Sequence, residues 1–527
     1  MGGRLVVCLL LSCSIFVTVS GDLSHMFTAL AHMSGLVELE GRLLEELENY
    51  ITAEEKRLDE LRVFARTARQ VQAIAQSNPR GHILHPTNAM AVILRYHNMW
   101  GGRISYLTNS TAQAESLLSL IETNRVRFPN GDDYSGAVTQ LTRLQDTYLI
   151  TPRNLTEGHL GSVPAVPLTC KDCFDIGRVA YEEGDWWYTG QWMTEALRKF
   201  DEDQDTTGVE LADIYDHLAY AEYEMGNLRR ASQFTKDLLQ NEPNHERAKK
   251  NLVYYQKELV ENADQYDIPE PRSRVRDLSE EMESYEEFCR EGQPIPRNQH
   301  YKLMCFFYTK SNDPQLILRP AKIEIAYLNP KIFILRGLVS ETEILRLQEL
   351  GGPKLNRATV FDSNGKMVYS NIRTSKSAWL DEHEDELGHI SRINRRLEAL
   401  TNLDMSTAEL LQVCNYGIGG HYDPHFDYST EVRDVHSGDG RRIATVLMYL
   451  TDVTLGGCTV FTTAGAQLKP SRGDAAFWWN LKRSGEGDLR TRHAACPVLV
   501  GSKWVCNKWM HERGQEFRRR CALSPRK

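Results

Sequence analysis

Apolar residues recur at a seven-residue spacing near the start of the chain. Between about Met26 and Gln70 the repeat runs through Val37, Leu44, Ile51, Leu58 and Ala65, with Leu47, Leu61 and Ala68 at the complementary positions. A repeat of this kind is typical of helices that associate lengthwise. We expect residues 22–150 to form a helical dimerisation domain. The alternative is an amphipathic helix that packs against its own domain.

A second helical pattern, with the character of a repeat, covers residues 160–263. The residues that fit one tetratricopeptide unit, a helix–turn–helix of about 34 residues, are Tyr215, Leu218, Ala219, Gly226, Ala231 and Pro243. A unit around Cys173–Leu197 fits less well, because Trp186–Gly190 interrupts the pattern. Short repeat arrays form a concave face that binds peptides. The dense aromatic residues favour a polyproline II ligand, although any single ring is better explained as repeat core.

The pattern changes after residues 264–300, an acidic stretch punctuated by prolines that we expect to be a linker. Short runs rich in β-branched and aromatic residues follow, and we expect them to be strands: Ile323–Tyr327, Lys331–Leu335, Ile443–Leu450, Thr459–Phe461, Ala475–Trp479 and Val498–Val505. Many short strands over residues 301–527 favour a double-sheet or closed β fold. The predicted fold class is multidomain, with an all-α N-terminal half and a C-terminal double-stranded β-helix (jelly roll).

The first residues predict the compartment. Residues 1–21 resemble a secretory signal peptide, with Arg4 before the apolar run Leu5–Val19 and small residues at its end. An uncleaved anchor is the alternative, but the run is short for a bilayer span. In an oxidising lumen the sequons at Asn109 and Asn154 can be glycosylated and cysteines can pair. The chain ends without a KDEL-like signal, so we expect either secretion or retention in the endoplasmic reticulum by a partner.

Charge narrows the range of partners. The 527 residues include 62 Lys and Arg against 71 Asp and Glu, a formal net charge of −9. A chain of this balance without a basic tract is poorly suited to a nucleic-acid backbone. No later segment is apolar enough, over a sufficient length, to span a membrane. We therefore expect neither nucleic-acid binding nor a membrane span.

Candidate chemistry is concentrated near the C-terminus. His425, Asp427 and the distal His493 supply two imidazoles and a carboxylate, the ligand set of non-haem Fe(II) oxygenases, which leaves positions open for co-substrates. Lys503 lies ten positions after His493 and can pair with the far carboxylate of 2-oxoglutarate. A structural zinc site is less suitable, because no Cys-x-x-Cys pair lies near these ligands. The pattern predicts a dioxygenase that uses O₂ and converts 2-oxoglutarate to succinate.

Longer stretches of sequence carry a specific resemblance. They are Arg143–Tyr148, Ala180–Tyr181, Gln412–Gly417, Tyr422–Asp427, Gly485–Asp488, His493–Gly501, Lys503–Val505, Asn507–Trp509 and His511–Phe517. In these stretches the chain resembles the collagen prolyl 4-hydroxylase α-subunit family, and the resemblance covers nearly the whole mature chain. It implies hydroxylation of proline in X-Pro-Gly repeats of procollagen-like chains.

The resemblance also implies roles for single residues of the oxygenase domain. His425, Asp427 and His493 match the family's iron ligands, and Lys503 matches its 2-oxoglutarate lysine. His511 matches a histidine that assists co-substrate binding and decarboxylation. The remaining cofactors that the resemblance implies are O₂ as a co-substrate and L-ascorbate as the reductant that restores the iron.

The resemblance further implies a peptide groove, disulfides and a partner. Tyr220, Arg247, Asn251 and Tyr254 match groove residues for proline-rich peptides, whereas His217 stands where better-known members have tyrosine. The family's disulfides correspond to Cys289 with Cys305 and Cys496 with Cys521. The family assembles as an α₂β₂ tetramer whose β subunit is protein disulfide isomerase. Such a partner would supply the missing retention signal and hold the chain in the lumen of the endoplasmic reticulum.

Rival interpretations remain open at this point. A lysyl hydroxylase or a cytosolic oxygen-sensing prolyl hydroxylase is a sibling alternative, and the signal peptide and Lys503 oppose the cytosolic one. A non-catalytic collagen-binding chaperone with a decayed oxygenase domain is the second alternative, which the intact ligand set opposes. Cys170 and Cys173 have the spacing of a redox motif but lack its usual fold context.

Overall fold

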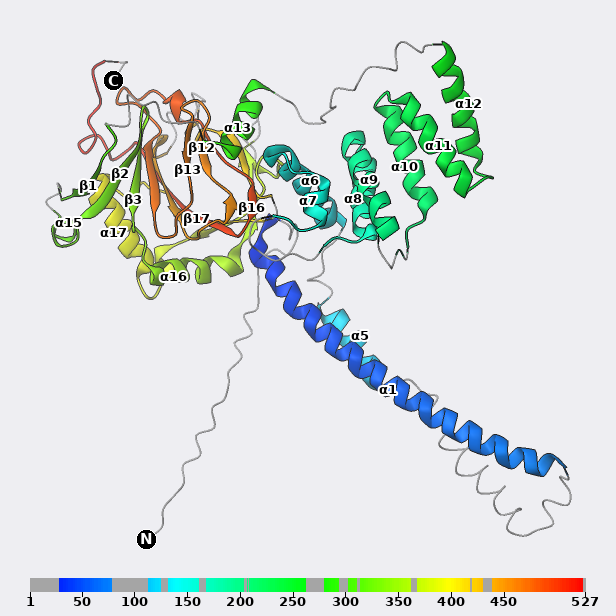
Figure 1. Cartoon of the computed structure of the whole chain (residues 1–527). Helices are drawn as coiled ribbons and strands as arrows, with labels where there is room; N and C mark the ends of the chain where they lie inside the picture. The colour runs from blue at the N-terminus through cyan, green and yellow to red at the C-terminus, as the bar shows by residue number, and fades with distance from the viewer. Residues whose placement is uncertain are drawn as a thin grey trace, which may run out of the picture. The chain divides into compact units, whose positions relative to one another are not determined.

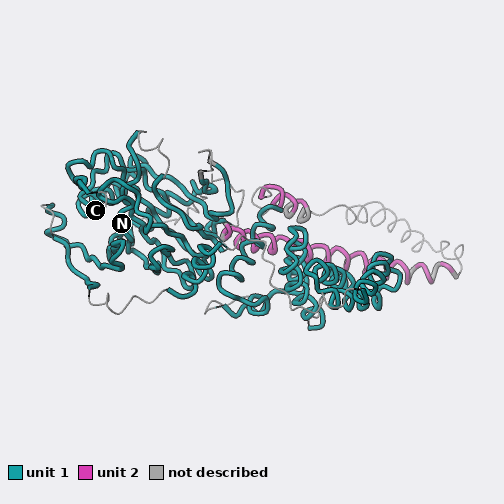
Figure 2. The backbone as a smooth tube through the Cα atoms, turned by 90° about the horizontal axis from the view of Figure 1, so that it is seen from above, with its two compact units in different colours: residues 1–31, 129–527 teal, residues 32–128 magenta. Residues whose placement is uncertain are grey.

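The structure is a computed structural model and is divided into two compact units. It describes residues 28–77, 112–124, 131–160, 167–202, 206, 208–261, 279–292, 302–309, 313–361, 367–417, 419–429 and 438–524. His32–Phe128 forms one unit, and Met1–Ala31 with Pro129–Lys527 forms the other (Figure 2). The predicted signal peptide and the Asn109 sequon lie outside the described residues. Across the described ranges, no helix combines the length and apolar content that a bilayer span requires.

One long helix dominates the smaller unit. This helix, α1 (Leu30–Ser77), has 48 residues, and α5 (Ala112–Asn124) is the second described helix of the unit (Figure 1). The apolar positions of the seven-residue repeat point to solvent along α1: Val37 is 71% exposed and Leu44 is 53% exposed. The predicted helix is therefore present. Its exposed apolar stripe is available for contact with a second chain, and dimerisation stays a prediction.

A helical repeat array extends over residues 170–261 of the larger unit. Its helices are α8 (Cys170–Glu182), α9 (Trp186–Glu202), α10 (Leu211–Glu224), α11 (Leu228–Asn241) and α12 (Glu246–Glu261). The turns of the α8–α9 and α10–α11 hairpins have the same backbone conformation. In each, a glycine adopts the left-handed conformation that favours this residue, Gly184 with φ 75° and Gly226 with φ 84°. The interruption expected at Trp186–Gly190 is wrong, since these residues form the first turns of α9 and complete a regular unit.

The C-terminal part of the larger unit contains two main antiparallel sheets. The large sheet has nine strands, in the order β1 (Cys305–Tyr308), β2 (Ala321–Leu328), β3 (Lys331–Arg336), β14 (Ala475–Trp479), β10 (Arg442–Tyr449), β17 (Lys503–His511), β8 (Leu411–Tyr416), β7 (Lys376–Leu380) and β4 (Asn356–Arg357). The small sheet has four, in the order β13 (Ala466–Leu468), β12 (Thr459–Phe461), β15 (His493–Ala495) and β9 (Tyr422–His425). This arrangement is the predicted jelly roll.

Shorter elements complete the C-terminal part. The short strand pairs are β11 (Leu455–Gly456) with β16 (Val498–Val500) and β5 (Val360–Phe361) with β6 (Met367–Val368). The helices are α15 (Pro314–Leu318), α16 (Glu341–Gly351) and α17 (His389–Thr401), with 3₁₀ turns at Gly352–Lys354, Glu382–Glu384 and Leu489–Thr491. Helix α16 begins at a capping box in which Ser340 and Glu343 each accept from the other's backbone N–H.

Side chains of the central strands alternate strictly between the two faces of the large sheet, and each face packs into a different core. In β10, Ala444, Val446 and Met448 join the core beneath α16 and α17, which cover one face of the large sheet (Figure 1). Leu447 and Tyr449 point the other way, into the core that includes residues of the small sheet. The second face therefore lies inside the jelly roll, and polar residues placed on it are withdrawn from water.

Two helices flank the jelly roll outside its sheets. The first, α6 (Gly131–Tyr148), is followed by the short helix α7 (Pro152–Thr156), and the second is α13 (Glu280–Arg290). Helix α13 lies inside residues 264–300, so this segment is not linker throughout. Tyr285, Phe288 and Cys289 form a buried stripe on it, at helical spacing within an otherwise acidic run.

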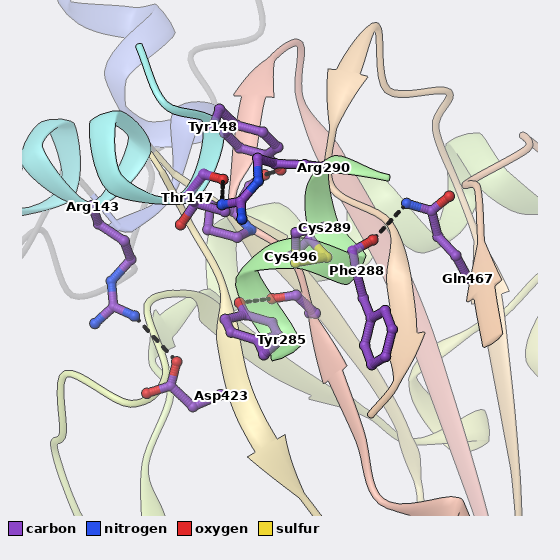
Figure 3. The surroundings of a disulfide bond; sticks show 12 residues. Arg143, Thr147, Tyr148, Tyr285, Phe288, Cys289, Arg290, Asp423, Gln467 and Cys496 are labelled. Carbon is purple, nitrogen blue, oxygen red and sulfur yellow. Dashed lines mark hydrogen bonds and ion pairs between the residues drawn. A yellow bond between two sulfur atoms is a disulfide. The ribbon is translucent and has the colours of Figure 1, made fainter. Parts of the chain in front are cut away.

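The disulfide differs from the expected pairing. Cys289 is bonded to Cys496, so neither the Cys289–Cys305 nor the Cys496–Cys521 pair is present, and Cys305 and Cys521 are exposed free thiols. The physical reason is the position of α13, which places Cys289 over the residue that follows β15 (Figure 3). The bond links positions 207 residues apart.

Candidate functional site

The predicted metal ligands converge where β9 and β15 pair. His493 lies directly opposite His425 in this antiparallel pair, and Asp427 follows the end of β9. The Nε2 atoms of His425 and His493 are each 3.7 Å from a carboxylate oxygen of Asp427. One ligand atom from each residue lies within 4.8 Å of the others, as a single metal ion requires. Sequence spacing alone thus located a set of side chains that the fold brings together.

Backbone carbonyls fix the orientation of both imidazole rings. Nδ1 of His425 is 2.8 Å from the carbonyl oxygen of Asp423, and Nδ1 of His493 is 3.0 Å from that of Thr491. A carbonyl only accepts, so each Nδ1 carries a proton and donates it. Each Nε2 therefore presents its lone pair to the centre, which is the form that binds a metal.

The charge state of the ligands also suits a divalent ion. Burial, together with the neighbouring His493, holds the pKa of His425 well below its ordinary value, so this ring stays neutral. Burial alone would raise the pKa of Asp427, but the adjacent imidazoles and Arg442 outweigh it and lower the pKa, so the carboxylate stays ionised. The Thr445 hydroxyl donates to Asp427 at 2.7 Å and fixes its rotamer. Two imidazoles and one carboxylate are the ligand set that fits Fe(II).

A cavity of about 420 Å³ opens beside these ligands. Alternate residues of β17, namely Lys503, Val505, Asn507 and Trp509, line it from the large sheet. The cavity therefore lies inside the jelly roll, between the β9–β15 pair and the inner face of β17. Its volume is ample for a small dicarboxylate together with part of a peptide side chain.

Lys503 is a buried cation in this cavity. Its side chain is 1% exposed, and burial lowers its pKa to about 8. Its ammonium group lies 5.0 Å from the centre of the Tyr416 ring, and across the described residues no carboxylate affects its pKa. A desolvated charge without a counter-ion is costly, so the site is suited to an incoming carboxylate. Lys503 thus has the environment that a 2-oxoglutarate anchor needs.

His511 is placed differently from the other predicted site residues. It does not belong to the cavity lining. Both ring nitrogens are engaged instead, because Nδ1 donates to the Gly440 carbonyl at 2.6 Å and Nε2 donates to Glu409 at 2.9 Å. Burial alone would lower its pKa, but these two acceptors outweigh burial and raise the pKa. Glu409 also accepts from Arg442, which does line the cavity. Any influence of His511 on a co-substrate would therefore be indirect, by way of Glu409 and Arg442.

Sequence reasoning missed several polar residues of the site, among them Arg373, Arg442 and Thr445. Arg373 and Arg442 line the cavity, and Thr445 holds Asp427. Thr445 carried a usable signal, since it is a polar residue inside the apolar run of β10. The two arginines carried none, because each depends on a strand pairing that is remote in sequence.

The predicted peptide-binding residues lie on α10 and α12 of the repeat array. Tyr220 belongs to a chain of rings in contact that runs through Tyr181, Tyr223 and Tyr254, with centroid separations of 5.6 to 6.3 Å. Arg247 of α12 forms an ion pair with Asp216 of α10, and Asn251 is half-buried one helical turn further on. We call the rings of Tyr181, Tyr220, Tyr223 and Tyr254 the aromatic strip.

Other predicted sites of the helical half can be placed as well. His217 lies beside the aromatic strip, 4.7 Å from the Tyr181 ring. Cys170 and Cys173 are both buried and are not joined by a disulfide, and burial raises the pKa of Cys173 to about 12, which disfavours the reactive thiolate. Asn154 is exposed, as glycosylation would require.

Comparisons with known proteins cover nearly the entire chain. Three family descriptions match: the prolyl 4-hydroxylase α-subunit N-terminal region at residues 29–162, the prolyl 4-hydroxylase peptide-substrate-binding domain at 170–261, and the 2OG-Fe(II) oxygenase superfamily at 411–511. Prolyl 4-hydroxylase subunit alpha-1 of Rattus norvegicus is 41% identical, over 94% of this chain and 96% of its own length. Subunit alpha-2 of Gallus gallus is 39% identical over 98% of each chain. Subunit alpha-1 of Caenorhabditis elegans is 40% identical, over 97% of this chain and 92% of its own.

Full-length identity at this level, together with a converged His-Asp-His site of the kind that binds Fe(II), leaves one conclusion. The chain belongs to the prolyl 4-hydroxylase α-subunit family and is a 2-oxoglutarate-dependent Fe(II) dioxygenase.

Proposed function

We propose that this chain is the catalytic subunit of a procollagen-proline 4-hydroxylase. The overall reaction consumes a peptidyl proline, 2-oxoglutarate and O₂, and forms peptidyl 4-hydroxyproline, succinate and CO₂. Iron bound by His425, Asp427 and His493 would supply the activation of O₂ that this oxidation needs. The chain's own residues orient the metal ligands, neutralise the co-substrate and exclude water from the cavity.

One observation supports the proposal most strongly. Lys503, a buried cation without an acidic partner among the described residues, lines the same cavity as His425 and His493. A dicarboxylate that reaches the metal with one end would place its other carboxylate against this ammonium group. Desolvation makes the pairing stronger than it would be in water. The cavity thus selects for length and for charge at both ends of the co-substrate.

The aromatic strip supports a proline-rich substrate. Its rings are partly exposed, and Tyr254 is 46% exposed. Rings at this spacing offer successive flat faces to the rigid polyproline II conformation, which loses little entropy on binding. Tyr220, Arg247, Asn251 and Tyr254 would contact such a peptide, and His217 would alter preference at one position along the strip. Repeated Pro-rich sequence can then be held while successive prolines are oxidised.

The cellular setting follows from the same proposal. A signal peptide at 1–21 and sequons at Asn109 and Asn154 suit the lumen of the endoplasmic reticulum. Protein disulfide isomerase is the proposed β subunit of an α₂β₂ tetramer, and the exposed stripe of α1 is the proposed contact between the two α chains. L-Ascorbate would serve as the reductant that returns the iron to Fe(II) after an uncoupled turnover.

Turnover of a defined peptide tests the proposal. The chain co-expressed with protein disulfide isomerase, supplied with Fe(II), 2-oxoglutarate, ascorbate and a (Pro-Pro-Gly) repeat peptide, is expected to form 4-hydroxyproline and succinate in equal amounts. The variant His493→Ala should bind the peptide and form neither product. Peptide binding without hydroxylation by the wild-type chain would favour the chaperone interpretation instead. Hydroxylysine in a lysine-containing peptide would favour the sibling enzyme.

A further inference from the structure

Helix α6 contacts the strand that carries the first proposed iron ligand. Arg143 forms an ion pair with Asp423 of β9, with 3.1 Å between Nη1 and Oδ1 (Figure 3). Both side chains are largely withdrawn from water, at 9% and 19% exposure. Asp423 is two residues before His425, and its backbone carbonyl is the acceptor that orients the His425 ring. The ion pair and the ring therefore share one residue.

Helix α13 makes equivalent contacts with the strand of the third ligand. The Tyr285 hydroxyl donates to the carbonyl of Ala495 at 3.0 Å, two residues after His493. Burial raises the pKa of Tyr285 well above its usual value, so the phenol remains a donor. The disulfide between Cys289 and Cys496 fixes the same helix to the next residue of the chain. Contacts from outside the sheets thus converge on both strands of the ligand pair.

The two helices are also fixed to each other and to their surroundings. Arg290 of α13 donates to the Thr147 carbonyl of α6 at 2.8 Å (Figure 3). Tyr148, at the end of α6, donates to the Pro497 carbonyl at 2.6 Å. On its other side, α6 is held by the repeat array, where the Trp192 indole donates to the Gln145 side chain at 3.0 Å. Arg143 therefore extends from a helix that is anchored at several points.

From this arrangement we propose that Arg143 is a positioning residue for the iron site. It holds Asp423 in place, so that the Asp423 carbonyl keeps the His425 ring directed at the metal. The proposal rests on the assignment of His425, Asp427 and His493 as iron ligands. It also assigns a role to α6, which lies within the matched N-terminal region at 29–162 yet belongs to the unit that contains the oxygenase fold. Residues 411–511 alone would lack this support.

A purely structural role is the competing explanation, and a matched variant separates the two. Arg396 of α17 forms a comparable ion pair with the buried Glu343 at 2.8 Å, on the opposite face of the large sheet from the ligand strands. Replacing Arg396 removes the same kind of interaction without touching β9 or β15. Both replacements should lower thermal stability, but only the loss of Arg143 should disturb the metal site.

Metal binding by the iron-free full-length chain, co-expressed with protein disulfide isomerase, is the test. Mn(II) is titrated and its free fraction followed by electron paramagnetic resonance. Arg143→Met is expected to raise the Kd for Mn(II) about tenfold, as is usual when a residue that orients a metal-binding histidine is lost. Arg143→Lys should restore most of the affinity, because it keeps the charge. Arg396→Met should leave the Kd unchanged.

Melting temperatures and two further variants decide between the positioning role and a purely structural role. An Arg143→Met chain that binds Mn(II) as tightly as wild type, while its melting temperature falls as in Arg396→Met, would overturn the proposal. If Arg143→Met does not fold, Asp423→Asn serves instead: weaker Mn(II) binding supports the proposal and wild-type binding overturns it. His493→Ala tests the ligand assignment separately. Unchanged Mn(II) binding in that variant would refute the iron site itself, and with it the basis of the proposal. Lost binding in His493→Ala together with wild-type binding in Arg143→Met would refute only the role of Arg143.

Discussion

Replacing Lys503 with methionine should abolish tight binding of 2-oxoglutarate while leaving the metal site intact. The side chain is 1% exposed, and burial lowers its pKa from 10.5 to about 8. Since each pKa unit corresponds to about 1.4 kcal/mol, the free chain spends about 3 kcal/mol to keep this ammonium group charged. A bound carboxylate recovers that free energy. Without Lys503 the carboxylate would itself be buried and unpaired.

The size of the effect follows from that unpaired carboxylate. Removing one partner of a buried ion pair costs about 3–5 kcal/mol, which corresponds to roughly two to four orders of magnitude in Kd. The assay is calorimetric titration of 2-oxoglutarate into the Mn(II)-loaded chain without O₂. The same loss should appear in the KM for 2-oxoglutarate, with a smaller change in the KM for peptide.

Lys508 provides a matched control on the same strand. It is 3% exposed and burial lowers its pKa to about 8, but its ammonium group donates to the Glu409 carbonyl and does not line the cavity. Lys508→Met should destabilise the fold and leave the 2-oxoglutarate Kd unchanged. Equal losses in both variants, or wild-type affinity in Lys503→Met, would refute the reasoning.

The affinity for 2-oxoglutarate should also depend on pH in a defined direction. Only the protonated form of Lys503 pairs with a carboxylate, and the free chain loses this proton as pH rises through about 8. The Kd should therefore be constant below that pH and rise about tenfold per pH unit above it. Constant affinity up to about pH 9.5 would show that another group binds the carboxylate.

Three further changes test other parts of the molecule. Tyr254→Ala should weaken binding of a proline-rich peptide about tenfold in calorimetric titrations, because one aromatic contact of about 1 kcal/mol or slightly more is lost. Tyr254→Phe should bind like the wild type, and equal binding by all three chains would show that the aromatic strip does not hold the peptide. Cys289→Ser should lower the free energy of unfolding by about 2–5 kcal/mol in urea titrations, and non-reducing peptide mapping of the wild type should recover Cys289 joined to Cys496; recovery of Cys289 joined to Cys305 would contradict the structure. Ile51→Glu, on the exposed stripe of α1, should convert an α-chain dimer to a monomer in light scattering, and a persistent dimer would place the interface elsewhere.

The parts of the fold that were predictable have a short-range signal. The strands β12 and β14 have the predicted bounds, because alternating β-branched and aromatic residues report a pleated, buried strand directly. The predicted run from Val498 to Val505 is in fact two strands, since Gly501 adopts a positive φ of 112° and breaks it. Part of the ligand set could be predicted for a similar reason, because His425 and Asp427 are only two residues apart in the sequence.

The parts that sequence missed depend on long-range packing. Helix α13 was hidden in an acidic, proline-bounded segment, because it is short and its buried apolar residues are only Tyr285, Phe288 and Cys289 among many charges. The partner of Cys289 followed from where that helix packs, which no local pattern encodes. The ion pair of Arg143 with Asp423 spans 280 residues. The sequence did mark both residues, within Arg143–Tyr148 and Tyr422–Asp427, but not that they meet.

Isotope labelling of the products tests the central claim most directly. The chain is incubated under ¹⁸O₂ with Fe(II), 2-oxoglutarate and a (Pro-Pro-Gly) repeat peptide, and both products are analysed by mass spectrometry. A 2-oxoglutarate-dependent dioxygenase divides one O₂ between its two substrates, so 4-hydroxyproline and succinate should each gain one ¹⁸O atom. Hydroxyproline that takes its oxygen from water, or succinate without label, would contradict the account of the site formed by His425, Asp427, His493 and Lys503.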